Sequence, residues 1–432
     1  MYRDIAKLIM YGDIDEDCIL YQMGEIFREF EEGTQSNAVL IRKVYTQIKR
    51  LLTVATDFGF DKNLWHNYLA YFLITNENPF SITCEKIGAN DGSVNHFARN
   101  DFSAIKNLFE YDFSEIEKSL GIDCFTQISN YRAIEKKELM YNKNVSEKVQ
   151  ALSSRMEQAR DVEGFFTAVT EFYRDYGVGM FGLNKAFRIQ DRTDSKLVFL
   201  PINNMDKVML SDLVGYEIQK KKLVDNTRAF VEGKKANNVL LFGDSGTGKS
   251  TSIKAIVNEF YDQGLRMIEI YKHQFKDLSN VIAAVKNRNY KFIIYMDDLS
   301  FEEFEIEYKY LKAVIEGGLE KKPDNILIYA TSNRRHLVRE TFKDKADRDE
   351  ELHTNDTVQE KLSLVARFGV TIYFGKPDKK EFQKIVTTLA DRYGVEMEEE
   401  KLLLEANKWE LSHGGLSGRT AQQFIDYLLG QQ

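Results

Sequence analysis

Eight residues in the second half of the chain have the types and the spacing of a phosphate-binding loop. They are Gly243, Asp244, Ser245, Gly246, Thr247, Gly248, Lys249 and Ser250, which fit the pattern G-x-x-x-x-G-K-[ST]. The glycines allow the backbone to turn tightly and bring its N–H groups to phosphate oxygens. In such a loop the lysine reaches the β- and γ-phosphates, and the serine hydroxyl binds Mg²⁺. The sequence therefore predicts a site for a nucleoside triphosphate.

The segments on either side of this loop have the pattern that such a site needs. Residues 238–242 form a short apolar run, long enough for one buried strand. Residues 250–260 repeat apolar side chains at the spacing of one helix face. A helix that begins at the loop adds the partial positive charge of its N-terminus. We expect a strand, a loop and a helix in succession, with Thr251 beside the nucleotide.

The rest of the second half alternates between strands and helices. Further strands are predicted at 266–270, 292–296, 325–331 and 368–374, and helices at 218–231, 278–285 and 308–315. Such alternation is typical of a parallel sheet with helices on both faces, here with five strands. Asp297 and Asp298 follow the third strand, and Asn333 follows the fourth. An acid in the position of Asp297, after a phosphate loop, indicates a Mg²⁺ ligand.

The first half has a different pattern, which predicts a mainly helical N-terminal domain. Apolar side chains recur at three- and four-residue spacing between 39 and 55, and an aromatic-rich run follows at 65–74. Such a stripe is typical of a helix packed in a core, with a peptide-docking groove as the alternative. Residues 177–182 fit the dinucleotide-binding pattern G-x-G-x-x-G, but the segment before them is helical. We expect a helix end and a loop there instead.

Composition and charge narrow the class of protein. No run of about eighteen apolar residues occurs, so no membrane span is expected. The three cysteines, Cys18, Cys84 and Cys124, are widely spaced and form neither a metal-binding pair nor a disulfide framework, which favours a reducing cytoplasm. The net charge of −8 disfavours a general nucleic-acid binder, although a local basic patch would still allow contact with nucleic acid.

These motifs together resemble those of the AAA+ family of ATPases, over about residues 206–430. The resemblance implies that the nucleotide is ATP and that Mg²⁺ accompanies it. The segment 210–217, which contains Val214 and Gly215, looks like the part of such proteins that packs against the adenine.

The resemblance also implies roles for single residues. Asp297 would hold Mg²⁺ through water, with Ser250 as the other protein ligand. Asn333 matches the sensor-1 position, which orients the attacking water, and Arg419 matches sensor 2 in the lid. Arg367 sits where related ATPases carry an arginine finger that acts on a neighbour's nucleotide. A homo-oligomer is therefore implied.

One departure from the family pattern concerns the second acid. Segments 297–302, 330–337 and 415–421 look more narrowly like an uncharacterised bacterial AAA+ family known only as a domain of unknown function. Most AAA+ members have glutamate where this chain has Asp298, and that glutamate positions or deprotonates the attacking water. Aspartate can do the same chemistry but is one methylene shorter. Glu302 or Glu303 is the alternative base.

The sequence thus predicts three domains. They are a mainly helical N-terminal domain at 1–195, an α/β nucleotide-binding domain at 206–374 and a helical lid at 375–432, with a short strand at 196–201 in the connection. The first hypothesis is an ATP-hydrolysing oligomer whose N-terminal domain binds a protein client. The alternatives are a regulatory switch or scaffold with little turnover, and a nucleic-acid remodeller akin to helicase loaders, which the acidic balance disfavours.

Overall fold

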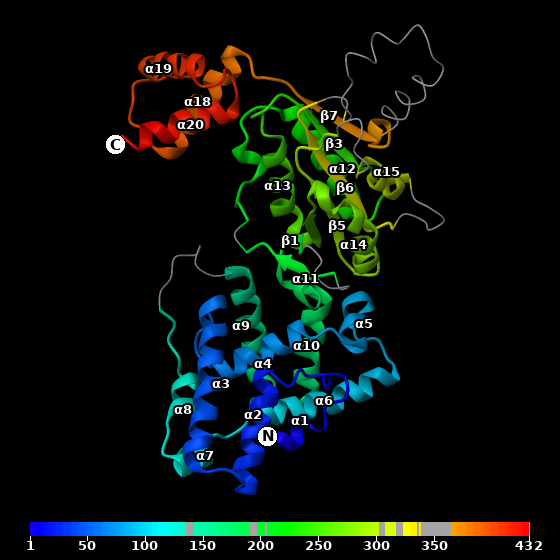
Figure 1. Ribbon diagram of the computed structural model, residues 1–432, viewed down its shortest axis with the longest axis vertical. Coiled ribbons are helices and arrows are strands. Elements are labelled where there is room, and N and C mark those ends of the chain that lie inside the picture. Colours follow the sequence, from blue (N-terminus) through cyan, green and yellow to red (C-terminus); the bar gives the residue numbers. More distant parts are fainter. Residues whose placement is uncertain are drawn as a thin grey trace. The chain divides into compact units, whose positions relative to one another are not determined.

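The computed structural model consists of two compact units, Met1–Asn184 (unit 1) and Lys185–Gln432 (unit 2) (Figure 1). It describes residues 1–134, 142–190, 197–203, 205–301, 307–316, 323–334, 337 and 364–431. Unit 1 ends before the expected domain boundary at 195, because the residues that follow Asn184 join the sheet of unit 2.

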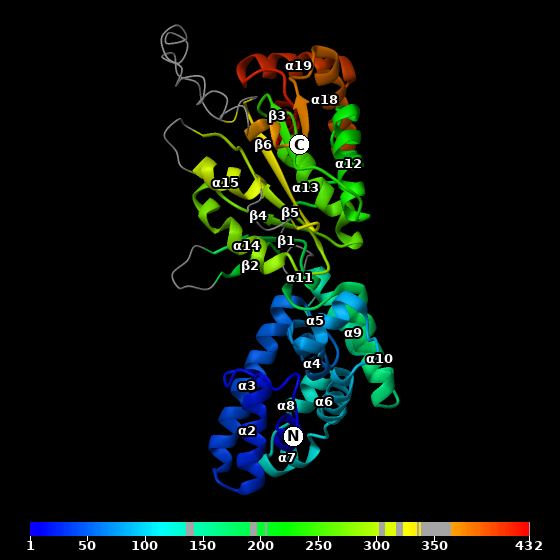
Figure 2. The ribbon, with the colours of Figure 1, turned by 90° about the vertical axis from the view of Figure 1, so that its right-hand side faces the viewer.

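Unit 1 is built from helices, as the apolar periodicity predicts (Figure 2). They are α1 (Tyr2–Ile5), α2 (Ile19–Glu32), α3 (Asn37–Phe58), α4 (Leu64–Thr75), α5 (Pro79–Ile87), α6 (Ser93–Phe109), α7 (Ser114–Leu120), α8 (Cys124–Ser129), α9 (Lys143–Gln158), α10 (Val162–Tyr176) and α11 (Met180–Leu183). Their apolar faces share one core, in which Trp65, Phe102 and Phe165 are fully buried. The aromatic-rich helix α4 is buried along most of its length, which confirms that its stripe belongs to the core.

Buried polar contacts fix the N-terminal segment of unit 1 to the helices. The carboxylate of Asp101 accepts hydrogen bonds of 2.7–3.0 Å from three consecutive backbone N–H groups at 9–11. The hydroxyl of Tyr11 lies 2.9 Å from that of Tyr173, which donates to the carbonyl of Leu73 at 2.7 Å. Each of these buried groups therefore has a partner, as a stable interior requires.

The glycine-rich stretch 177–182 ends one helix and leads into the next. Gly177 caps α10 at a φ of +78°, which favours glycine, and its N–H donates to the carbonyl of Tyr173 at 2.9 Å. Gly182 lies inside the short helix α11. Because a helix precedes these glycines, the expectation of a helix end rather than a dinucleotide loop is confirmed.

The sheet of unit 2 has seven strands, where five were expected. They are β1 (Ala186–Ile189), β2 (Phe199–Pro201), β3 (Val239–Gly243), β4 (Leu265–Glu269), β5 (Lys291–Met296), β6 (Ile326–Ser332) and β7 (Val370–Phe374), in the order β2-β1-β4-β5-β6-β3-β7. All neighbours are parallel except β2, which is antiparallel to β1. The two extra strands are β1 and β2. Strand β1 joins the sheet because Ala186 pairs with Met267 of β4, and β2, which overlaps the strand expected at 196–201, pairs with β1.

Helices cover both faces of this sheet, and a separate group forms a lid (Figure 2). The sheet helices are α12 (Glu217–Val231), α13 (Lys249–Phe260), α14 (Leu278–Val285) and α15 (Glu307–Glu316), with 3-10 turns at Leu210–Asp212, Tyr261–Gln263 and Lys272–Asp277. The lid contains α18 (Lys379–Tyr393), α19 (Glu399–Ser412) and α20 (Gly418–Leu429), which share a core of their own. The predicted fold class, an α/β module with a helical lid after a helical domain, is confirmed.

Candidate functional site

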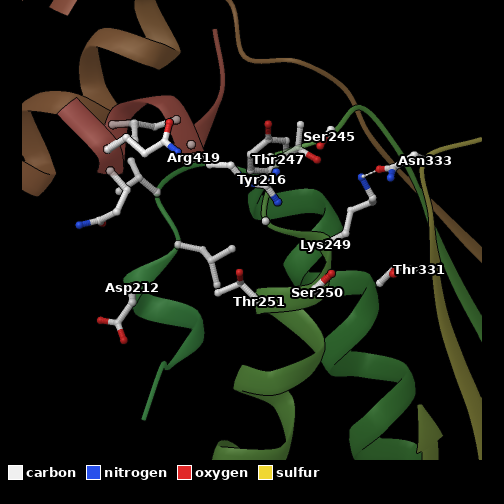
Figure 3. Close-up of a pocket in the computed structure, with 18 of the residues that line it drawn as sticks. Asp212, Tyr216, Ser245, Thr247, Lys249, Ser250, Thr251, Thr331, Asn333 and Arg419 are labelled. Carbon is white, nitrogen blue, oxygen red and sulfur yellow. Dashed lines mark hydrogen bonds between the residues drawn. The ribbon is translucent and has the colours of Figure 1, made fainter. Parts of the chain in front are cut away.

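A cavity of about 800 Å³ lies in unit 2, where β3, β5 and β6 end and the lid begins (Figure 3). Of the predicted site residues, its wall contains Val214, Ser245, Gly246, Thr247, Gly248, Lys249, Ser250, Thr251, Asp297, Asp298, Asn333 and Arg419. Gly215, Gly243, Asp244 and Arg367 are not among the lining residues. Segments far apart in the second half of the sequence thus converge on one cavity.

The phosphate loop is packed so closely that two positions require glycine. Gly246 has a φ of +77°, and a Cβ atom there would lie 3.0 Å from the hydroxyl of Ser417 in the lid. Gly248 has a φ of +90°, and a Cβ atom there would lie 2.6 Å from a methyl group of Leu213. The backbone N–H of Arg419 donates to the carbonyl of Gly246 at 3.2 Å. The loop is therefore held between the lid and the segment before α12.

The side chain of Lys249 lies inside the curve of the loop. Its ammonium group donates to the carbonyls of Gly243 at 3.0 Å and Asp244 at 2.6 Å, and to Oδ1 of Asn333 at 3.1 Å (Figure 3). Burial lowers the pKa of Lys249, and the nearby carboxylates, Asp244 first, oppose this shift. A cation in this position faces the space that the loop encloses, as phosphate binding requires.

Asp297 follows β5 and has the surroundings of a metal ligand. Its Oδ1 atom accepts hydrogen bonds from Ser250 Oγ at 2.7 Å and Thr331 Oγ1 at 2.5 Å. Partial burial would raise the pKa of Asp297, but these hydrogen bonds outweigh it and leave the pKa below its ordinary value. Mg²⁺ in nucleotide sites accepts one or two protein oxygens beside phosphate oxygens and water. The carboxylate and hydroxyl found together here fit that donor set.

The backbone of Asp298 offers a local reason for the departure from glutamate. Its φ is +48°, a left-handed conformation in which aspartate is several-fold more common than most residues. Its N–H donates to Thr331 Oγ1 at 2.9 Å, and its Oδ1 accepts a hydrogen bond from Asn333 Nδ2 at 2.8 Å. The second acid is thus directed toward Asn333. Glu302 and Glu303, the alternative bases, lie outside the described residues.

Apolar walls close the cavity on the side of the lid. Ile385 and Leu389 of α18 face the cavity together with Val214. Tyr216 has a φ of +59°, its hydroxyl donates to the carbonyl of Gly375 at 2.8 Å, and its ring lies 5.1 Å from that of Phe374. This tyrosine fixes the segment 210–217 against β7, so that the apolar side chains can flank a planar ring.

A family comparison concerns the same unit. The family model described as "Protein of unknown function (DUF815)" matches residues 183–432. The chain belongs to the DUF815 family. No curated protein matches the chain.

Several solved structures are similar to part of the chain. A Thermotoga maritima RuvB mutant is 18% identical with a TM-score of 0.36, covering 52% of this chain and 65% of that one, which is less than two thirds. The FIGL-1 AAA domain in complex with ADP is 17% identical with a TM-score of 0.37, covering 52% and 74%. C. elegans PCH-2 is 14% identical with a TM-score of 0.36, covering 51% and 70%. Because these scores are below 0.5, the AAA+ assignment rests on this chain's own strand order, phosphate loop and lid.

Arg367 does not line the cavity of unit 2. It is exposed and precedes β7. In the sheet register the first residue of β7, Val370, pairs with Val239 at the start of β3, whereas Phe374 pairs with Gly243, where the loop begins. Strands rise about 3.3 Å per residue, so the length of β7 separates Arg367 from the loop of its own chain.

Several residues of this site were not predicted, and Thr331, Ile385 and Leu389 are among them. Thr331, Ile385 and Leu389 line the cavity, but the sequence marks them only as parts of a strand and a helix. Their apolar or β-branched types are those of core residues, so no local signal sets them apart. Within the described ranges, no helix is long and apolar enough to cross a membrane, and no three His, Cys, Asp or Glu side chains are grouped for a metal.

Proposed function

We propose that this DUF815 chain binds ATP with Mg²⁺ in the cavity of unit 2 and hydrolyses the γ-phosphate. The observation that carries the proposal is one continuous set of hydrogen bonds. It joins the loop lysine to Asn333, Asn333 to Asp298, the Asp298 backbone to Asp297, and Asp297 to Ser250. A lysine, two carboxylates and an amide around a phosphate loop are the parts that phosphoryl transfer uses.

Binding of the nucleotide would use the two sides of the cavity separately. Val214, Ile385 and Leu389 supply apolar surface for the adenine. On the other side, the loop N–H groups and the N-terminus of α13 attract the phosphates. Lys249 and Arg419 add two positive charges along the cavity wall. The mixture of apolar and cationic walls supports a nucleotide over a phosphate ion alone.

Hydrolysis needs a proton acceptor beside the attacking water. The water oxygen forms a bond to the γ-phosphorus, the bond to the β–γ bridging oxygen breaks, and ADP and phosphate leave. Asp298 accepts the proton of the water, and Asn333 orients that water. Ser250 and, through water, Asp297 would hold Mg²⁺, which would supply positive charge beside the phosphate oxygens. Lys249 stabilises the charge that develops on the transferred group.

The proposal includes an assembly of several copies. The distance of Arg367 from its own loop supports a role at the nucleotide of a neighbouring copy. Its guanidinium keeps its charge at neutral pH and suits the charge that develops on a phosphoryl group. The cavity residues all belong to unit 2, which supports a separate task for unit 1, the binding of a protein client.

One observation favours a second candidate, a switch in which ATP binding drives assembly with little turnover. The carboxylate of Asp298 is shorter than that of glutamate, and one of its oxygens is engaged by Asn333. A shorter carboxylate that is held by Asn333 reaches less far toward a water at the γ-phosphate, so it would deprotonate that water less readily. The switch would bind ATP and assemble without releasing phosphate.

The variant Asp298→Asn tests the proposed function. It removes the proton acceptor but keeps an oxygen for Asn333, so ATP affinity should stay unchanged while hydrolysis falls by about two orders of magnitude. Phosphate release and calorimetric titration measure the two quantities, with Asp225→Asn on the exposed side of α12 as the control. Normal hydrolysis by Asp298→Asn would exclude this acid as the base. Wild-type protein that assembles with ATP and releases no phosphate would favour the switch.

A further inference from the structure

Thr331 uses one hydroxyl to contact both acids of the cavity. Its side chain is 2% exposed near the end of β6. The hydroxyl donates to Oδ1 of Asp297 at 2.5 Å and accepts the backbone N–H of Asp298 at 2.9 Å. A hydroxyl is both donor and acceptor, and here both functions are used, one on each acid.

The backbone of Thr331 makes a third contact with the turn formed by residues 297–299. Its carbonyl accepts the N–H of Leu299 at 2.7 Å. The register of β5 and β6 pairs Met296 with Ala330, so the next residues along, Asp297 and Thr331, lie beside each other. A β-branched side chain in a strand has few rotamers, which fixes where its hydroxyl points. Thr331 thus secures the turn 297–299 by side chain and main chain together.

The conformation of this turn requires such support. Asp298 has a φ of +48°, and a non-glycine residue keeps a sparsely populated conformation only where its surroundings hold it there. The contacts that hold it are the hydroxyl of Thr331, the carboxylate of Asp297 and the amide of Asn333. Of these groups, only the Thr331 hydroxyl contacts both acids from a buried position.

We propose that Thr331 is a positioning residue that couples the metal-binding acid Asp297 to the hydrolytic acid Asp298. This inference rests on the proposed function of the cavity. Ser250 also donates to Oδ1 of Asp297, but its hydroxyl is itself an expected metal ligand. Thr331 would hold the carboxylate in place when Ser250 turns to the metal. Partners that orient a metal ligand in this way typically contribute ten- to a hundredfold to metal affinity or activity.

Two substitutions of Thr331 distinguish the effect of its hydroxyl from the effect of its side-chain shape. Thr331→Val keeps the shape and removes the hydroxyl, whereas Thr331→Ser keeps the hydroxyl. The full-length chain is titrated with Mn²⁺ in the presence of a non-hydrolysable ATP analogue, with free Mn²⁺ followed by electron paramagnetic resonance. We expect Thr331→Val to raise the Kd for Mn²⁺ about tenfold or more, and Thr331→Ser to stay within about threefold of wild type. Hydrolysis at saturating Mg²⁺ should fall in the valine variant alone.

Thr227→Val is the matched control. Thr227 is also buried, at 0% exposure, and its hydroxyl bonds the carbonyl of Leu223 and the hydroxyl of Tyr329, each at 2.8 Å, outside the cavity. This variant should lose stability and keep the wild-type Kd for Mn²⁺. Equal Mn²⁺ affinity and hydrolysis in Thr331→Val and wild type would overturn the inference, as would equal losses in the valine and serine variants. Wild-type protein that binds no Mn²⁺ with the analogue would overturn the proposed function and this inference with it.

Discussion

In unit 1 the carboxylate of Asp101 is enclosed by backbone, whereas in unit 2 Asp297 and Asp298 border a cavity. Asp101 is 0% exposed, and three successive N–H groups donate to its two oxygens. Asp297 and Asp298 are partly exposed, and their carboxylate contacts come mainly from hydroxyl and amide side chains. Both arrangements provide hydrogen bonds to a carboxylate, but only the second leaves carboxylate oxygen atoms within reach of a ligand.

This difference separates an acid that serves folding from one that serves chemistry. Backbone donors are fixed by the fold, so a carboxylate they surround anchors a segment and does not exchange partners. Hydroxyl and amide donors can rotate, and the same groups can bind a metal or a water when one arrives. Asp101 therefore holds the N-terminal segment of unit 1, whereas Asp297 and Asp298 stay available to a ligand.

The largest effect is expected on ATP hydrolysis when Arg367 of unit 2 is replaced, which tests whether unit 2 acts in an assembly. Arg367→Ala should lower hydrolysis per subunit about thousandfold with ATP affinity unchanged, because a neighbouring site loses a guanidinium. Mixing Arg367→Ala with Lys249→Ala should restore activity, since the lysine variant still supplies Arg367 to an intact loop. Turnover assays of both variants and their mixture measure this, with Arg228→Ala on α12 as the control. An inactive mixture of variants that demonstrably co-assemble would contradict a role in trans.

A smaller effect tests unit 1. Asp101→Asn should lower the free energy of unfolding of this unit by about 2 kcal/mol, because an amide places N–H groups against backbone donors and loses the charge. Denaturant titration followed by the fluorescence of buried Trp65 measures it, with Trp409 of unit 2 replaced by Phe in every protein and exposed Asp91→Asn as the control. ATP affinity should not change. Unaltered unfolding, or weaker ATP binding, would contradict the division of roles between the two acids.

The sequence predicted the parts of the site that depend on residues close together in the chain. The phosphate loop is eight consecutive residues, and Asp297 and Asn333 each follow an apolar strand directly. Because parallel strands end at a common edge, these local features were sufficient to bring six of the loop residues, Asp297 and Asn333 to one cavity.

The parts that the sequence did not predict depend on pairing between distant segments. The role of Thr331 arises only from the register of β5 and β6, and its residue type is that of any strand. The strand β1 has four residues, too few for a periodic signal, and joins the sheet through β4. The left-handed backbone of Asp298 was equally hidden, because aspartate is compatible with many conformations.

The most direct test of the central claim is calorimetric titration of ATP in the presence of Mg²⁺ into wild-type protein, Lys249→Ala and the control Lys254→Ala, five residues further along α13. The account predicts that wild type and Lys254→Ala bind ATP alike. Lys249→Ala should bind at least about tenfold more weakly, because a charge-assisted contact to the phosphates is lost. Unfolding of unit 1 in Lys249→Ala should match wild type. Equal ATP affinity in all three proteins would contradict the assignment of this cavity as the nucleotide site.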